Sequence, residues 1–321
     1  MGDALWSRVM KGRVRTIRRS YLQWLREWVG QVRGGARTLP FSNMILGLLL
    51  VAASWRIWVW YGERMLDGAD EPFGVLALAV ALGFAWRREL LEAVSWERMV
   101  GFVAVLGVYS FFDDRVSLLV SAGFVVLALA VLWGRSDGWV GHWGLFALSL
   151  PLIASLQFYG GFPIRWVVGR VCTGLLNLVG LEVTAVGTAL HWKGEMVIID
   201  APCSGIQMLW MGAFFSCVII CRWKLDTLSS FKLLQFAGLA VFGANVLRNF
   251  SLFFLETEII RAPEWGHSGV GLGFFALALW GTWKRAEGLG KLRTKSEELK
   301  VGMEGEMKGR AVCMGRDLVL D

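Results

Sequence analysis

A cysteine at a helix-start signal is the residue of this 321-residue sequence best suited to nucleophilic chemistry. Cys203 follows Asp200 and Pro202, and an acidic cap with a proline in the first turn predicts the start of a helix. The helix dipole and the free backbone N–H groups at such a start favour the thiolate, which is the nucleophilic form of cysteine. We therefore interpret Cys203 as a candidate nucleophile.

The two residues after the cysteine could complete a site for acyl transfer. The N–H groups of Ser204 and Gly205 could bind an oxyanion, and Gly205 leaves room for a substrate backbone to approach. The alternative is that Cys203 is a buried thiol that packs like a small apolar residue. Cys217 and Cys221 fit that alternative, because they lie 14 and 18 residues further on, about 20–27 Å deeper in the same predicted helix.

Arg248 interrupts a long apolar stretch of the sequence. It lies seven residues before Leu255, which places it about 10 Å below the outer end of the predicted helix. An arginine at the centre of a membrane-inserted helix costs about 2.5–3.5 kcal/mol, so an intramembrane arginine indicates a functional site. The alternative is an arginine that snorkels to the outer headgroups. Asn245 lies on the same helix face, three residues earlier.

His267 stands at the start of the next apolar stretch and is a candidate base. Cysteine with histidine is the minimal pair of nucleophile and base, and Arg248 adds a fixed positive charge for a thiolate or an oxyanion. His142 is assigned to the inner end of another span, and His191 is a weaker rival in an outer loop. Four outer acidic residues could orient His267: Asp200, Glu256, Glu258 and Glu264.

The elements that must position these residues are apolar helices. The chain is 55% hydrophobic and 18% charged, whereas a soluble domain is about a quarter charged. This composition excludes a disordered chain, and five cysteines are too few for a disulfide-stapled secreted module. We predict an all-α polytopic membrane protein with about eight spans of bilayer length. They cover residues 43–61, 72–86, 99–113, 116–134, 139–158, 203–222, 231–255 and 267–284.

The charge distribution orients these spans. Residues 1–40 hold nine basic and two acidic residues, whereas the first outer loop, 62–71, is acidic. By the positive-inside rule, both termini are cytoplasmic, and Cys203, Arg248 and His267 meet at the outer face. We therefore expect a multi-pass protein of the cytoplasmic (inner) membrane, with its candidate site on the outer or periplasmic side.

Three regions follow from this organisation. Residues 1–42 are predicted to form a cytoplasmic basic amphipathic segment that binds lipids of the inner leaflet. Residues 43–284 form the membrane domain, whose catalytic half is 151–284, and residues 285–321 form a flexible cytoplasmic tail. Because the positive charge belongs to one segment, it indicates no surface for nucleic acid.

The one long outer loop, residues 159–202, lies directly before the cysteine. Residues 163–181 are interpreted as a re-entrant or interfacial helix. Residues 182–200 are rich in Val, Ile and Thr and predict a β-hairpin over the outer face, with its turn at 192–194. A loop of this length in a compact protein is usually functional.

Together, these residues resemble the exosortase/archaeosortase family of multi-pass membrane cysteine transpeptidases. The resemblance covers about residues 151–283 and is carried by four segments: "PLIASLQFYGGFPIRWVVGR", "GLEVTAVGTALHWKGEMVIIDAPCSGIQML", "NVLRNFSLFF" and "GHSGVGLGFF". It implies a membrane cysteine protease or transpeptidase whose substrates are C-terminally anchored exported proteins. Their sorting signal is a short motif (Pro-Glu-Pro in the bacterial version), one transmembrane helix and a basic end.

The resemblance also implies roles for individual residues. Cys203 is the nucleophile that forms a thioester, Arg248 stabilises the anionic intermediate, and His267 is the acid/base. Whether Arg248 or His267 activates the thiol stays open. The acceptor, which is a lipid amine, a sugar or water, also stays open. Ser204, Gly205 and Asn245 are expected to support substrate binding.

Two other interpretations compete with this one. The first is a non-enzymatic component of polysaccharide export or a small transporter, although a transporter more usually has its polar residues near the membrane midplane between repeats. The second makes Cys203 structural, in a disulfide with Cys172 of the same outer loop. We expect no metal and no cofactor, because the three histidines fall on both faces and no glycine-rich phosphate loop is present.

Overall fold

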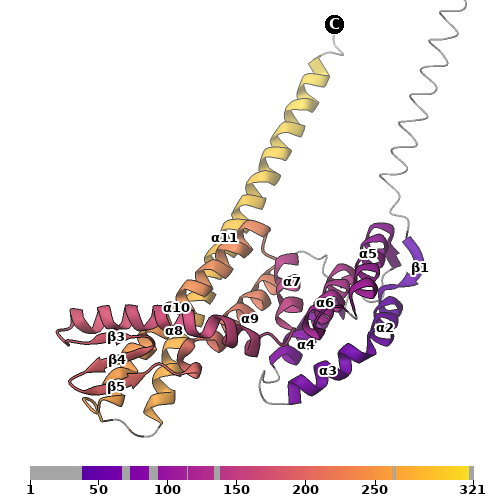
Figure 1. The fold of residues 1–321 in the computed structure, drawn as a ribbon. Helices are drawn as coiled ribbons and strands as arrows, with labels where there is room; N and C mark the ends of the chain where they lie inside the picture. The colour runs from indigo at the N-terminus through magenta and orange to yellow at the C-terminus, as the bar shows by residue number, and fades with distance from the viewer. Residues whose placement is uncertain are drawn as a thin grey trace, which may run out of the picture.

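The computed structural model describes residues 38–66, 73–86, 93–113, 115–133, 138–261, 263 and 265–317. The predicted amphipathic segment lies outside the described residues except for its last five. The described part is mostly helical, with one three-stranded sheet beside the helices of its C-terminal half (Figure 1).

The N-terminal half is a group of short helices around an apolar core. Its elements are β1 (Thr38–Ser42), α2 (Asn43–Ala53), α3 (Trp55–Leu66), α4 (Phe73–Trp86), β2 (Ala93–Ser95), α5 (Trp96–Phe112) and α6 (Leu118–Trp133). β1 and β2 pair in antiparallel fashion. Buried side chains such as Leu50, Leu129 and Phe146 join this half to the helix that follows.

The first predicted span, 43–61, is wrong as a single helix, because the chain bends by 77° between α2 and α3. The Ser54 hydroxyl donates to the Leu50 carbonyl at 2.7 Å and accepts from the Trp58 indole at 3.1 Å. A serine that bonds the carbonyl four residues back competes with the helical ladder and bends the helix.

The C-terminal half carries the predicted site. Its elements are α7 (Trp139–Leu148), α8 (Ile153–Leu178), β3 (Thr184–Val186), β4 (Ala189–Trp192), β5 (Glu195–Ile198), η1 (Ala201–Ser204), α9 (Ile206–Trp223), α10 (Thr227–Glu256) and α11 (Gly266–Asp317). The helix α9 packs against α7 and α10, and α10 packs along α11 (Figure 1). The carboxylate of Asp226 caps α10 by accepting from the Ser229 N–H at 3.1 Å.

The predicted fifth span, 139–158, is also wrong as a single helix, because α7 ends at Leu148 and α8 leaves it at 93°. Pro151 stands between the two helices, and a proline both lacks an N–H and keeps the residue before it out of the helical region. The helix α8 therefore contains both the end of that predicted span and the first part of the predicted outer loop, 159–202. Residues 163–181 do not form a separate segment.

The segment predicted as a hairpin forms a three-stranded antiparallel sheet in the order β3-β4-β5. Between β4 and β5, Lys193 and Gly194 have φ of 50° and 89°. A two-residue hairpin turn whose twist matches that of the strands requires positive φ at both residues. The buried Leu190 of β4 packs with Val168 and Leu176 of α8. The sheet is thereby fixed on α8 (Figure 1).

Within the described residues, α9 and α10 are each long and apolar enough to cross a membrane. The number rises to four if each bent pair, α2–α3 and α7–α8, is one span. The helices at residues 73–85 and 118–133 are apolar but shorter. The structure is that of a helical membrane protein, and eight spans are not confirmed.

The last helix, α11, continues to Asp317, through residues predicted to form a flexible tail from position 285. Just beyond the apolar part, Glu287 pairs with Lys284 at 3.1 Å and with Lys291 at 2.9 Å. Such pairs three and four residues apart stabilise an exposed helix.

Two glycines of α7 allow it to approach α9 closely. A Cβ at Gly141 would lie 2.6 Å from the Cys217 carbonyl oxygen, and a Cβ at Gly144 would lie 2.5 Å from the Cys217 sulfur. Small residues permit this kind of close contact between membrane helices. Cys217 and Cys221 are buried in this contact, as packing thiols.

We expect Gly141→Ala to lower the melting temperature of the detergent-solubilised protein by about 3–10 °C, because overpacking costs about 1–3 kcal/mol. The matched control is Gly123→Ala on α6, where an added Cβ meets nothing within 4 Å. Equal melting temperatures for the two variants would contradict the close approach of α7 and α9.

Candidate active site

A cleft of about 300 Å³ opens beside Cys203. One wall comes from β4 and β5, and the other comes from the adjoining ends of α10 and α11. Its polar lining residues are Glu195, Asp200, Cys203, Asn249, Glu256 and His267. The structure thus brings two predicted site residues, Cys203 and His267, to one cavity.

Cys203 lies in the short turn η1 and not in the first turn of the long helix. Its N–H donates to the Asp200 carbonyl at 2.9 Å. Gly205, with φ of 84°, then separates η1 from α9, which begins at Ile206. The sulfur-bearing residue is half-buried and stands outside the membrane-spanning helix.

Two asparagines of α10 hold this turn in place. The Asn245 amide donates to the carbonyl oxygens of Cys203 at 3.2 Å and Ser204 at 3.1 Å. The Asn249 amide donates to the same Cys203 carbonyl at 3.2 Å and to the Asn245 carbonyl at 2.8 Å. The sequence analysis missed Asn249, although two asparagines four residues apart in an apolar helix were the available signal.

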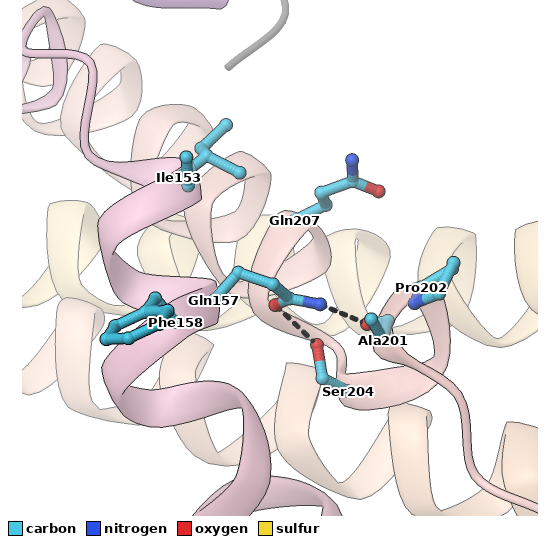
Figure 2. A pocket seen from close by; sticks show the side chains of 8 residues that line it. Ile153, Gln157, Phe158, Ala201, Pro202, Ser204 and Gln207 are labelled. Carbon is cyan, nitrogen blue, oxygen red and sulfur yellow. Dashed lines mark hydrogen bonds between the residues drawn. The ribbon is translucent and has the colours of Figure 1, made fainter. Parts of the chain in front are cut away.

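The expectation that Gly205 leaves room for a substrate backbone is wrong. A Cβ at Gly205 would lie 2.6 Å from both Cγ and Nδ2 of Asn245, so the space is already filled. The side chain of Ser204 is buried and donates to the Gln157 carboxamide of α8 at 3.0 Å. Ser204 and Gln157 line a second cavity instead of the cleft (Figure 2).

The structure pairs His267 with one of the acidic candidates. Its Nε2 lies 3.7 Å from Oε1 of Glu256. Asp200 lines the cleft, Glu258 lines a neighbouring cavity, and Glu264 lies outside the described residues. The imidazole is 44% exposed, which leaves it accessible to a substrate.

The other two histidines are elsewhere. His191 belongs to β4, between the cleft-lining Leu190 and the turn of the sheet, and it is not among the cleft-lining residues. His142 is buried in α7, where its ring meets Phe84 edge-on at 5.9 Å. Neither takes the place of His267 beside the cysteine.

Arg248 lies on α10 and packs over α11. A Cβ at Gly271 would lie 2.9 Å from its Nε and 3.5 Å from its Cζ. The Nε group is buried and has no hydrogen-bond partner among the described residues. Buried donors are normally paired, so an unpaired N–H at this position is unusual. Arg248 is not among the residues that line the cleft.

The pKa of the Cys203 thiol is raised above its ordinary value, chiefly because burial disfavours the charged form. The positive charge of Arg248 acts in the opposite direction and lowers it, whereas the negative charges of Asp200 and Glu256 raise it further. This direction is opposite to the one expected for a cysteine at a helix start.

Cys172 is a free thiol that is fully buried in α8, where its sulfur lies 3.5 Å from the Val246 carbonyl oxygen. Cys203 is free as well, so the alternative of a disulfide between them is not what the structure contains. Among the described residues, no group of three or more His, Cys, Asp or Glu side chains could hold a metal ion.

We expect alkylation of Cys203 by iodoacetamide to rise with pH, with a midpoint above that of an unfolded cysteine peptide. Asp200→Asn should lower the midpoint, because it removes a negative charge, and Arg248→Gln should raise it. The measurement is the alkylation rate by mass spectrometry on a protein that keeps Cys203 as its one cysteine. Shifts of the same sign in both variants would refute this electrostatic arrangement.

Replacing both Asn245 and Asn249 with leucine leaves two carbonyls of the η1 turn without their side-chain donors. We expect the free energy of unfolding to fall by about 1–3 kcal/mol for each carbonyl. Thermal denaturation in detergent measures the loss. The control is Gln235→Leu, at an exposed position of the same helix, and an equal effect there would mean that the asparagines do not hold the turn.

Comparison with known proteins identifies the family of this chain. The model of the transmembrane exosortase family matches residues 41–283, which include every candidate site residue named above. A search of curated proteins and a search of solved structures returned no match. Since the family match covers more than half of the sequence, the chain belongs to the transmembrane exosortase family.

Proposed function

We propose that this protein is a membrane cysteine protease or transpeptidase that cleaves C-terminal sorting signals of exported proteins through a thioester on Cys203. The observation that carries the proposal is the cleft that Cys203 shares with the paired His267 and Glu256. The exosortase family match supports the enzyme over an export component or a transporter.

In this mechanism His267 is the base that activates the thiol. Its proximity to the carboxylate of Glu256 suits it to accept the Cys203 proton, because a carboxylate orients the imidazole and stabilises the imidazolium. The raised pKa of Cys203 makes this transfer necessary. The sulfur then attacks the scissile carbonyl carbon, and the carbonyl oxygen becomes an oxyanion.

Arg248 stabilises the negative charge of that intermediate. Its positive charge already lowers the pKa of Cys203, and its buried Nε has no partner among the described residues. A fixed positive charge in a partly buried site is a strong stabiliser of a developing oxyanion. The backbone N–H groups of Ser204 and Gly205 are the further predicted donors.

The intermediate collapses when the carbon–nitrogen bond breaks. His267 returns its proton to the leaving amine, and Cys203 keeps the acyl group as a thioester. An incoming amine, hydroxyl or water then attacks the thioester and releases the thiol. Attack by an amine or a hydroxyl group transfers the acyl group, whereas attack by water hydrolyses the thioester.

The location of the site suits an anchored substrate. Cys203 lies just before α9, a helix long enough to cross a membrane, so the nucleophile stands at the level where a spanning helix ends. We place this level at the outer face of the cytoplasmic membrane, with both termini of the chain inside. A substrate with one transmembrane helix and a basic cytoplasmic end would present its cleavage motif there.

The test is processing of tagged reporters in cells. The reporters end in a Pro-Glu-Pro-type signal or in native C-terminal signals from the same organism, and a gel shift reports cleavage. Wild type should shorten at least one reporter, and Cys203→Ala should shorten none. Arg248→Ala should reduce the rate about 10²–10³-fold, and His267→Ala about 10²–10⁴-fold.

His191→Ala is the matched control, because this histidine does not line the cleft, and it should retain the wild-type rate. Cleavage by Cys203→Ala would show that the nucleophile is another residue. A wild type that processes none of the reporters would contradict the proposed function itself.

A further inference from the structure

The turn that carries Cys203 separates two cavities. Asp200 and Cys203 line the cleft described above. Ala201, Pro202 and Ser204 line a different cavity of about 430 Å³ (Figure 2). The beginnings of α8 and α9 complete this second cavity. We call it the Gln157 cavity, and its lining includes Ile153, Gln157, Phe158, Pro202, Ser204 and Gln207.

The wall of the Gln157 cavity is bonded directly to the cysteine turn. The Gln157 carboxamide donates to the Ala201 carbonyl and accepts from the Ser204 hydroxyl at 3.0 Å (Figure 2). The Ser204 hydroxyl in turn accepts from the Ile206 N–H at 3.4 Å. These bonds hold the second cavity at a fixed position relative to Cys203.

The two cavities differ in charge. The cleft is lined by the three acidic side chains Glu195, Asp200 and Glu256, together with His267. The residues that line the Gln157 cavity carry no ionisable side chain. A charged group would lose its hydration there without gaining a partner, so the cavity suits an uncharged ligand.

The surroundings of the Gln157 cavity are those of a membrane interface. Phe158 and Tyr159 at the start of α8 are each 79% exposed, and Phe162 one turn later is 55% exposed. Aromatic side chains concentrate at the level where the apolar part of a membrane meets the headgroups. These exposed aromatic side chains favour an orientation in which the Gln157 cavity faces lipid and the acidic cleft faces water.

We infer that the Gln157 cavity binds the uncharged segment that follows the scissile bond, which is the first turn of the substrate's own transmembrane helix. The substrate residues before the scissile bond then lie in the acidic cleft. The first N–H groups of a helix have no partners within the helix, and the carboxamide oxygens of Gln157 and Gln207 can accept from them. This inference rests on the proposed function and assigns the two sides of the cleaved bond to the two cavities.

A charge-exchange experiment tests the assignment in the complete membrane protein. A reporter with lysine at the first position after the mapped cleavage site should be cleaved at least tenfold more slowly than one with alanine. Gln207→Glu should restore cleavage of the lysine reporter at least threefold and should slow a glutamate reporter. Thr184→Glu, at an exposed position of β3 that lines neither cavity, is the control and should leave all three rates unchanged. Equal cleavage of the lysine and alanine reporters would overturn the inference.

Cross-linking tests binding without cleavage. The photoreactive residue p-benzoylphenylalanine replaces Phe158, or Phe162 as the control outside the cavity lining, in the Cys203→Ala protein. The adduct from position 158 should be at least fivefold stronger and should map after the scissile bond. An adduct that maps before this bond, or one no stronger than that from position 162, would overturn the assignment. Failure of the proposed function is a different result, because it is a wild type that cleaves no reporter.

Discussion

The hydrogen bonds from Asn245 and Asn249 to the Cys203 carbonyl are the interaction on which the site depends. They tie a four-residue turn, which has little structure of its own, to a 30-residue helix. The same helix carries Arg248 and ends at Glu256, the partner of the candidate base. One helix therefore sets the positions of the candidate nucleophile, of Arg248 and of the carboxylate beside the candidate base.

Opposing influences act on the pKa of the Cys203 thiol. Burial and two carboxylates raise the pKa of Cys203, and one arginine lowers it. A protonated thiol is less open to oxidation and to chance electrophiles than a thiolate is, because the thiolate is the reactive form. In the proposed mechanism, a raised pKa of Cys203 would keep the thiol unreactive until His267 takes its proton.

The sequence predicted that Cys203 and His267 lie near each other, but it predicted less well the elements that hold them. Charge and hydropathy placed Cys203, Arg248 and His267 on one side, because these signals report on whole spans. The breaks at Ser54 and Pro151 were missed, since apolar composition continues across each break and hides the local hydrogen bonding that bends the chain. The role of Gly205 was predicted wrongly, because the space beside it is occupied by the side chain of Asn245, which lies forty positions later in the sequence.

Three polar residues of α10 lie on one side of the helix. Asn249 and Glu256 follow Asn245 by four and eleven residues, spacings that bring a side chain back to the same side. Each residue of an α-helix advances the side-chain direction by about 100°. A single inserted residue between positions 249 and 256 would therefore turn the carboxylate away from the histidine while the cysteine turn stayed held. The helix sets the direction in which Glu256 points as well as its distance from Asn249. This stretch therefore tolerates a change of side chain better than a change of length.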